Sequence, residues 1–328
     1  MKTNTRCKIL VLLLLSSVSA VMGQNHPQLS QYTFNGLYIN PAYAGYHGGW
    51  NLQAVYRNEM SGVEGSPRTF TVSADGAPWK ERVGVGVTIT QDNLGAESNT
   101  SLYLSYAYRI PLGGRNNPRL SFGLSGGFIH SRVDMSRLSP DDVTDPALQE
   151  GNSRRFLPDA RAGVFYDDDR FYAGFSATNM IVHFSKQKED PLQQVPEKKL
   201  QLYLTGGMLL DLSEVVLLKP SFLLRDDAGG PGSVDVNVSA LIKELLWVGC
   251  SYRRELNLYS KSSVGKGLER GSSLAGMLSV YIRQRLRIGY AYEHQLSQPG
   301  GMGRPGHEVS IGYIFSRQQD NGGKRRLF

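Results

Sequence analysis

Apolar residues recur at every second position over most of this chain, and this alternation limits the folds that it can adopt. From Val83 to Ile89 every second residue is aliphatic, and the residues between them are glycine or threonine. Successive side chains of a β-strand point to opposite faces, so the pattern predicts strands with one apolar face and one small or polar face. Helical spacing is nowhere comparably sustained, and we expect an all-β fold. Similar alternation returns at residues 102–110, 200–210, 234–238, 274–282 and 286–292.

Two all-β classes produce such alternation, the soluble sandwich and the transmembrane barrel. Many of the alternating runs reach about 10 residues, as a tilted membrane-spanning strand requires, whereas soluble strands usually have about five or six. Tyrosine is abundant, with 17 residues, and it recurs near the ends of the runs, where a barrel has its aromatic girdles. Both features favour the barrel. The tyrosines concerned are Tyr56, Tyr106, Tyr108, Tyr252 and Tyr292.

The connections between runs separate the two classes further. When the predicted strands are numbered in chain order, the connections after even-numbered strands are short. Those after odd-numbered strands are longer, notably Ser131 to Leu157 and Asn179 to Lys198. Short periplasmic turns on one rim of a barrel and surface loops on the other predict this sorting, and they place both termini in the periplasm. We predict fourteen antiparallel strands, at residues 50–58, 68–76, 81–91, 98–111, 117–130, 158–167, 170–178, 199–211, 214–225, 232–242, 244–252, 271–283, 285–296 and 306–316.

The first 23 residues predict export. Lys2, Arg6 and Lys8 precede an apolar run, and small residues follow it, as in a signal peptide cleaved before Gln24. Its removal leaves Cys250 as the only cysteine, which excludes an intramolecular disulfide. Later in the chain no window offers about 18 consecutive apolar residues, so strands must make any membrane span. We divide the chain into a signal peptide (1–23), an amino-terminal segment (24–49), an outer-membrane barrel (50–316) and a basic periplasmic tail (317–328).

The small net charge argues against nucleic-acid binding, and the lack of a recognisable catalytic motif argues against an enzyme. The signal peptide holds three of the 36 basic residues and none of the 29 acidic ones, so the net charge of +7 falls to +4 without it. Nucleic-acid binding would require basic residues clustered on one face. The six histidines stand in no recognisable catalytic string, and the acidic run from Asp167 to Asp169 falls in a short turn, where hydration explains it. We expect no enzyme, no cofactor and no metal.

The segment before the first strand carries two motifs. Residues 28–35 read QLSQYTFN, and residues 37–45 read LYINPAYAG. They resemble the amino-terminal signature of the PorP/SprF family, "SQY-x-FN" followed by "NPA-Y-AG", although Gly36 stands where relatives prefer proline. The later strings Tyr56-Arg57-Asn58 and Tyr106 to Leu112 also resemble family features. The signature residues are Ser30, Gln31, Tyr32, Phe34, Asn35, Asn40, Pro41, Ala42, Tyr43 and Gly45.

The last predicted strand resembles the glycine-containing, aromatic-terminated closing strand that barrel-assembly machinery reads, with Gly312, Tyr313 and Phe315 as its hallmark residues. The chain continues for thirteen further residues, so either Phe315 or Phe328 is the recognised aromatic.

The resemblance implies an outer-membrane barrel, shaped like the fatty-acid channels, that supports type IX secretion and gliding. It implies partnership with periplasmic machinery, including a peptidoglycan-binding lipoprotein, and with a secreted cargo or surface adhesin that the barrel helps to export or anchor. A diffusion channel for small or hydrophobic solutes is the alternative.

The amino-terminal segment from Gln24 to Gly49 is polar, rich in tyrosine and without alternation. Two placements fit this composition. It can fold into the lumen as a plug whose amides and phenols bond to inward-facing polar side chains, or it can extend as a periplasmic arm.

Overall fold

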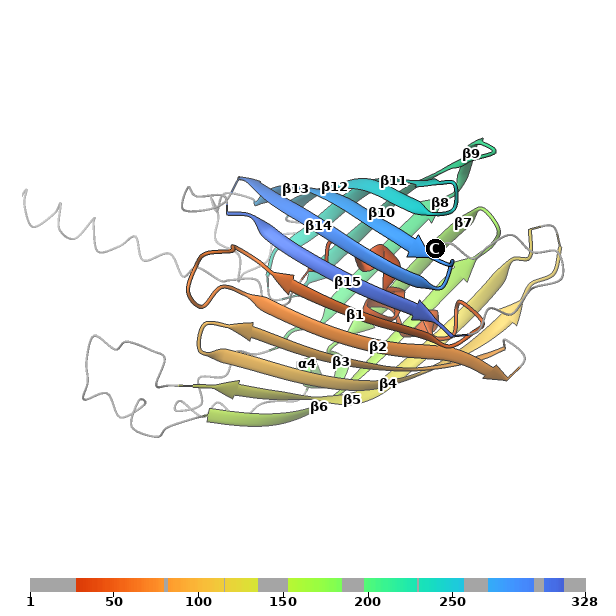
Figure 1. Cartoon of the computed structure of the whole chain (residues 1–328). Coiled ribbons are helices and arrows are strands. Elements are labelled where there is room, and N and C mark those ends of the chain that lie inside the picture. The colour runs from red at the N-terminus through yellow and green to blue at the C-terminus, as the bar shows by residue number, and fades with distance from the viewer. Residues whose placement is uncertain are drawn as a thin grey trace, which may run out of the picture.

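The computed structural model describes residues 28–79, 82–114, 116–134, 153–184, 198–228, 230–256, 271–297 and 304–315. Within these ranges fifteen strands form one antiparallel sheet, which closes on itself because β10 pairs with both β8 and β11. Strands β8 and β9 both pair with β10 and share one position in the wall. The predicted closed barrel of fourteen antiparallel strands is therefore confirmed, and Figure 1 shows its tilted strands side by side.

The helices are short and the strands are long. Two 3-10 turns, η1 (Tyr32–Phe34) and η2 (Pro41–Tyr43), flank the helix α2 (Gly36–Ile39), and α4 (Met180–Phe184) follows the seventh strand. The strands are β1 (Asn51–Asn58), β2 (Arg68–Trp79), β3 (Val83–Leu94), β4 (Glu97–Pro111), β5 (Arg119–Val133), β6 (Ser153–Asp167), β7 (Phe171–Thr178), β8 (Gln201–Met208), β9 (Leu210–Ser213), β10 (Val216–Asp227), β11 (Gly232–Ile242), β12 (Leu246–Leu256), β13 (Ser272–Ile282), β14 (Leu286–Ser297) and β15 (Gly306–Ile314).

The strands expose their apolar side chains and bury their polar ones. In β5, Leu124 is 66% exposed, whereas the next residue, Ser125, is 6% exposed. In β15, Val309 is 51% exposed and Glu308 is 1% exposed. A barrel in lipid requires this inversion, because its outer face meets hydrocarbon and its inner face can be wet. The five tyrosines assigned to aromatic girdles all lie on the exposed face.

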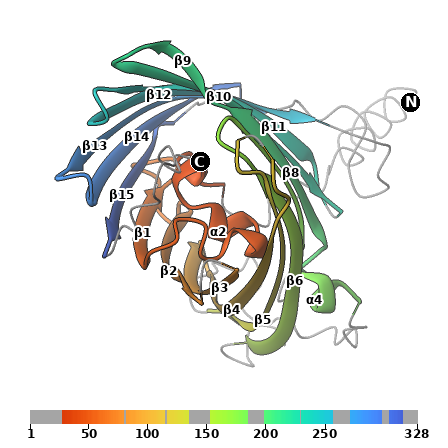
Figure 2. The ribbon, with the colours of Figure 1, turned by 90° about the vertical axis from the view of Figure 1, so that its right-hand side faces the viewer.

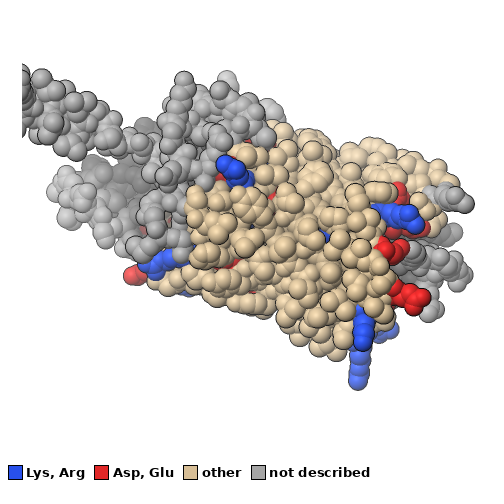
Figure 3. Space-filling model, turned by 90° about the horizontal axis from the view of Figure 1, so that it is seen from above, with Lys and Arg blue, Asp and Glu red and all other residues tan. Residues whose placement is uncertain are grey.

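Charged side chains gather towards the ends of the barrel. In the space-filling view of Figure 3, lysine, arginine and acidic residues lie near the two ends, and the surface between them is largely free of them. An uncharged belt between two charged rims is the surface that a bilayer-spanning barrel presents. Among the described residues, no helix has both the length and the apolar character to cross a membrane.

The two rims differ in their connections. One rim, here called the short-turn rim, carries connections of three residues or fewer after β2, β6, β9, β11 and β13, and a longer one after β4. The opposite rim, the long-loop rim, includes the connections after β5, β7 and β12. The predicted sorting fails at two places on this rim, because β3 and β4 are joined by only Gly95 and Ala96, and β10 and β11 by residues 228–231. Strand β1 begins, and β15 ends, at the short-turn rim (Figure 1).

Strands β5 and β6 extend beyond their predicted ends. They pair without interruption from Arg119 opposite Asp167 to Val133 opposite Ser153. The predicted bounds of the loop from Ser131 to Leu157 are therefore wrong, because polar and basic residues at both of its ends pair in the β5–β6 ladder. The predicted strand at residues 199–211 was also wrong in one respect, since it breaks at Leu209, whose N–H bonds to the carbonyl of Arg170.

The wall is interrupted between β6 and β7. These two strands pair only from Ala162 to Asp167, because β7 ends before Asn179, which has a positive φ of 59°. Helix α4 then lies against the remaining half of β6. Its backbone N–H groups at Ile181 and Val182 bond to the Asp159 carboxylate at 3.1 and 3.4 Å. The predicted loop from Asn179 to Lys198 thus begins with a helix that replaces strand pairing.

The final strand closes the barrel. Strand β15 pairs with β14 on one side and with β1 on the other. Gly312 lies opposite Gln53, and Tyr313 lies opposite Leu52. Phe315 directly follows the strand, and its N–H bonds to the carbonyl of Trp50. These three predicted hallmark residues lie at the seam between the first and last strands. The predicted signal peptide and the basic tail lie outside the described residues.

Candidate functional site in the barrel lumen

Residues 28–49 lie inside the barrel. The helix α2 is enclosed by the ring of strands in the end-on view of Figure 2. Ser30 contacts Arg57 and Glu308, which lie towards the long-loop rim, whereas Gly45 contacts Asp75, which lies towards the short-turn rim. The segment therefore runs along the lumen from one rim towards the other. The described part of the segment thus contacts inward-facing residues of the wall, and its role as a plug in the membrane stays a prediction.

The first anchor of the segment is the carboxylate of Glu308 on β15. One of its oxygens accepts the N–H of Ser30 at 2.7 Å, and the other accepts the N–H of Gln31 at 2.8 Å. The side chain of Gln31 continues along the same strand, because its carbonyl accepts the Ser310 hydroxyl at 2.7 Å. A side chain at Gly289 would collide with Gln31, since a Cβ there would lie 2.3 Å from its Oε1.

Buried charges surround this anchor, and each of them has a partner of opposite sign. Arg57 bonds to Glu293 at 2.7 Å and to Glu308 at 3.3 Å, and it donates to the Ser30 hydroxyl at 2.7 Å. Arg253 of β12 approaches the other oxygen of Glu293 at 3.6 Å and pairs with Asp235 at 2.7 Å. A buried charge is costly unless it is paired and hydrogen-bonded, and this network meets that condition. It joins strands β1, β11, β12, β14 and β15 around the start of the segment.

The aromatic side chains of Tyr32 and Phe34 also contact the wall. The Tyr32 hydroxyl accepts the side-chain N–H of Asn237 at 2.5 Å. Burial and the nearby Asp235 raise the pKa of the Tyr32 phenol well above its ordinary value, so the phenol stays neutral. The guanidinium of Arg287 lies 4.3 Å from the centre of the Phe34 ring, a cation–π contact.

The two signature asparagines organise the middle of the segment. Asn35 accepts the hydroxyl of Ser73 at 3.0 Å. Asn40 caps η2, because its side-chain oxygen accepts the N–H of Ala42 at 2.9 Å, and Pro41 occupies the first position of that turn. The amide nitrogen of Asn40 also donates to the carbonyl of Val164 at 3.0 Å. Aspartate in place of Asn40 would lack this donor.

Glycines of the wall make room for the end of the segment. A Cβ at Gly123 would lie 2.1 Å from the Ala42 nitrogen, and a Cβ at Gly84 would lie 1.8 Å from the Ala44 oxygen. Gly45 has a φ of +70°, and its N–H donates to Asp75 at 2.8 Å. Only glycine adopts this conformation readily. The small inward residues of the alternating pattern thus form a seat for the signature string from Ala42 to Gly45.

Aromatic packing completes this seat. The rings of Tyr43 and Tyr46 are stacked at 4.7 Å between centroids, and Phe165 of β6 meets Tyr43 edge-on at 5.4 Å. Burial raises the pKa of the Tyr43 phenol well above its ordinary value, with neighbouring Tyr46 and Asp75 acting in the same direction. All ten signature residues therefore lie in the lumen, and all but Phe34 are buried.

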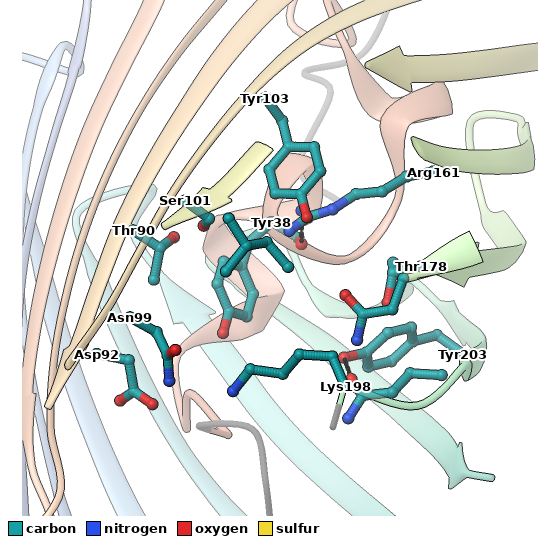
Figure 4. Close-up of a pocket in the computed structure, with 13 residues that line it drawn as sticks. Tyr38, Thr90, Asp92, Asn99, Ser101, Tyr103, Arg161, Thr178, Lys198 and Tyr203 are labelled. Carbon is teal, nitrogen blue, oxygen red and sulfur yellow. Dashed lines mark hydrogen bonds between the residues drawn. The ribbon is translucent and has the colours of Figure 1, made fainter. Parts of the chain in front are cut away.

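A cavity of about 50 Å³ remains beside α2, towards the long-loop rim. Figure 4 shows Tyr38 of the segment facing polar side chains of the wall, including Asn99 and Lys198. Tyr103 donates to Asp159 at 2.8 Å, and Arg161 lies over the Tyr103 ring. A space of this size holds on the order of a few water molecules. Its lining is mostly polar and comes from the segment and from the strands around it.

The wall residues that hold the segment were not among the predicted site residues. Glu308, Arg57 and Asp75 are charged residues on the inner face of apolar strands, and this was the available signal. Within the described ranges, no group of three or more His, Cys, Asp or Glu side chains could hold a metal. Of the acidic run, Asp167 pairs with Arg119, and Asp168 accepts the N–H groups of Arg170 and Phe171, so both shape the turn.

The chain matches one protein family in sequence and is similar in fold to solved barrel structures. The family profile described as "Type IX secretion system membrane protein PorP/SprF" matches residues 21–313. No curated protein matches the chain in sequence. Among solved structures, the CymD monoaromatic hydrocarbon channel is similar with a TM-score of 0.50 and 10% identity, over 85% of this chain and 91% of that one.

Two further barrels are similar at lower scores. An outer membrane channel from Pseudomonas putida F1 has a TM-score of 0.44 and 10% identity, over 82% of this chain and 96% of that one. BamA from Haemophilus ducreyi lacking POTRA domains 1-3 has a TM-score of 0.41 and 11% identity, over 81% and 70%.

Proposed function

Because this chain belongs to the PorP/SprF family of type IX secretion system membrane proteins, we propose that it is a non-enzymatic component of that system which supports the export or surface anchoring of a cargo or adhesin protein. The family assignment and the barrel fold together make it an outer-membrane component of type IX secretion. The role towards cargo, and the link to gliding, are the proposal.

The observation that carries the proposal is the occupied lumen. The segment at residues 28–49 lies within the matched family region, and wall residues hold it along the barrel. The segment occupies space in the lumen through which a folded cargo protein would have to pass. This supports a role in holding or assisting cargo beside the barrel, in preference to a role as its conduit.

The two rims suggest a division between partners. Short turns of barrels face the periplasm and longer loops face outward. In this proposal the short-turn rim meets the periplasmic machinery, including a peptidoglycan-binding lipoprotein, and the long-loop rim meets the secreted cargo or adhesin.

Deletion of the gene tests the proposal directly. We expect a secreted or surface-bound protein to be retained in the cell or released into the medium, and pull-down of the tagged barrel to recover a periplasmic lipoprotein. Restoration by the wild-type gene is the control. Normal secretion and normal surface display in the deletion strain would refute the proposal.

A diffusion channel is the second candidate, and the fold similarity to a hydrocarbon channel together with the luminal cavity supports it. Liposome swelling separates the two candidates. Substantial solute permeability of the purified wild-type barrel would favour the channel.

A further inference from the structure

Two arginines lie side by side on the outer face of the wall. Arg132 near the end of β5 and Arg154 near the start of β6 are direct partners in the β5–β6 ladder. Their neighbours Ser131 and Val133 are buried on the inner face, so Arg132 points outward by alternation, and Arg154 is exposed. Both lie at the long-loop rim, which in a bacterial barrel faces outward from the cell.

This pair places two positive charges next to each other. Directly opposite side chains on one face of a sheet are about 5 Å apart at their Cβ atoms, and like charges in this position repel. Asp134 lies 4.0 Å from Arg132. Within the part of the chain that the structure describes, no carboxylate forms an ion pair with Arg154. Arg154 therefore keeps its positive charge next to that of Arg132, and this favours an anion between the two guanidinium groups.

An apolar surface begins next to the pair, on the side towards the middle of the barrel. Phe156 is 63% exposed and stacks on Phe128 at 4.6 Å between ring centroids. Leu124 and Leu104, further towards the middle of the barrel, are 66% and 62% exposed. The arginines thus lie at the boundary between a lipid-facing belt and a polar rim, at the level where lipid headgroups are found.

We propose that Arg132 and Arg154 form a binding site for the phosphate of an outer-leaflet lipid, whose acyl chains lie against Phe128 and Phe156. Arginine suits this role because its planar guanidinium donates two parallel hydrogen bonds to a phosphate. The apolar belt below the arginines selects a lipid over a free phosphate ion. The site is independent of the proposed secretion role, since it requires only that the barrel is in the outer membrane.

Binding of defined lipids to the purified full-length barrel tests the proposal. Native mass spectrometry would compare monophosphoryl lipid A with its dephosphorylated form, for the wild type and for the double variant Arg132→Gln/Arg154→Gln. Arg68→Gln is the matched control, because Arg68 is an exposed arginine at the same rim whose ladder partners are the neutral residues Asn58 and Asn93. Heat-modifiable migration in gels would verify that each variant is folded.

We expect the wild type to prefer the phosphorylated lipid about tenfold, the double variant to lose this preference, and Arg68→Gln to retain it. Arg154→Lys, which keeps the charge but loses the paired donors, should retain part of the preference. Equal binding of both lipids by the wild type would overturn the proposal, and so would an equal loss in Arg68→Gln. Competition of inorganic phosphate as effective as that of the lipid would also overturn it, by removing the acyl contribution.

Discussion

The carboxylate of Glu308 on the last strand accepts the backbone N–H of Ser30, 278 positions away in the chain, at 2.7 Å. Its second oxygen accepts the N–H of the next residue, Gln31. One wall side chain therefore fixes the start of the luminal segment and lies beside the seam at which β15 pairs with β1. The signature residues act as parts of the barrel interior.

Replacement of Glu308 by glutamine should loosen this anchor. The amide keeps one acceptor oxygen but cannot accept both N–H groups and balance Arg57, so we expect a loss of roughly 2 kcal/mol in unfolding free energy. Cleavage by an added protease near residues 28–35 should also become faster. Urea unfolding in lipid vesicles and mass mapping of the cleavage sites measure the two effects.

Glu64→Gln is the control for this experiment, because Glu64 is an exposed loop residue. Unchanged stability and unchanged cleavage in Glu308→Gln would contradict the assigned role of the anchor.

Alanine at Gly123 should displace the segment from its seat. The added Cβ would lie 2.1 Å from the Ala42 nitrogen, and overpacking of this kind costs about 1–3 kcal/mol. Hydrogen exchange of the amides at residues 42–46 should accelerate. Gly126→Ala in the same strand is a matched control, since nothing lies within 4 Å of a Cβ there. Equal exchange in both variants would argue against close contact between the segment and β5.

The luminal segment should also limit conductance. Removal of residues 28–49 takes away side chains that occupy part of the lumen, so single-channel conductance in planar bilayers should rise from a low wild-type level. A folded barrel, shown by heat-modifiable migration, is the condition for the comparison, and Glu308→Gln should show an intermediate frequency of openings. A wild-type conductance as large as that of the deletion variant would show that the segment does not obstruct the lumen.

The sequence predicted the wall well because each strand carries its own local signal. Alternation at residues 83–89 and 286–292 reflects two environments on either side of a single strand, so no distant partner is needed to recognise it. The even strand number and the predicted girdle tyrosines followed from the same reasoning. The ends of β5 and β6 were missed because polar residues such as Ser131 and Arg155 pair beyond the belt, where alternation fades.

The contents of the lumen were less predictable. The motifs at residues 30–45 indicated a special segment, but the sequence left a plug and an arm open, since Asn35 and Asn40 suit either. Their partners, Ser73 on β2 and the carbonyl of Val164 on β6, are brought near only by closure of the barrel. The short helix α4 was missed for a similar reason, because Asp159, which binds its first turn, belongs to a different strand.

We expect residues 28–49 to occupy the lumen of the barrel in the membrane. The most direct measurement is a cysteine crosslink in intact cells between Asn35→Cys and Ser73→Cys, whose side chains lie 3.0 Å apart, with Cys250 replaced by serine. The pair Thr71→Cys/Thr90→Cys, two inward side chains of adjacent strands at 3.2 Å, is the positive control. We expect both pairs to form an intramolecular crosslink, and Ser73→Cys alone to form none. A crosslink in the control pair without one between residues 35 and 73 would contradict the luminal placement of the segment.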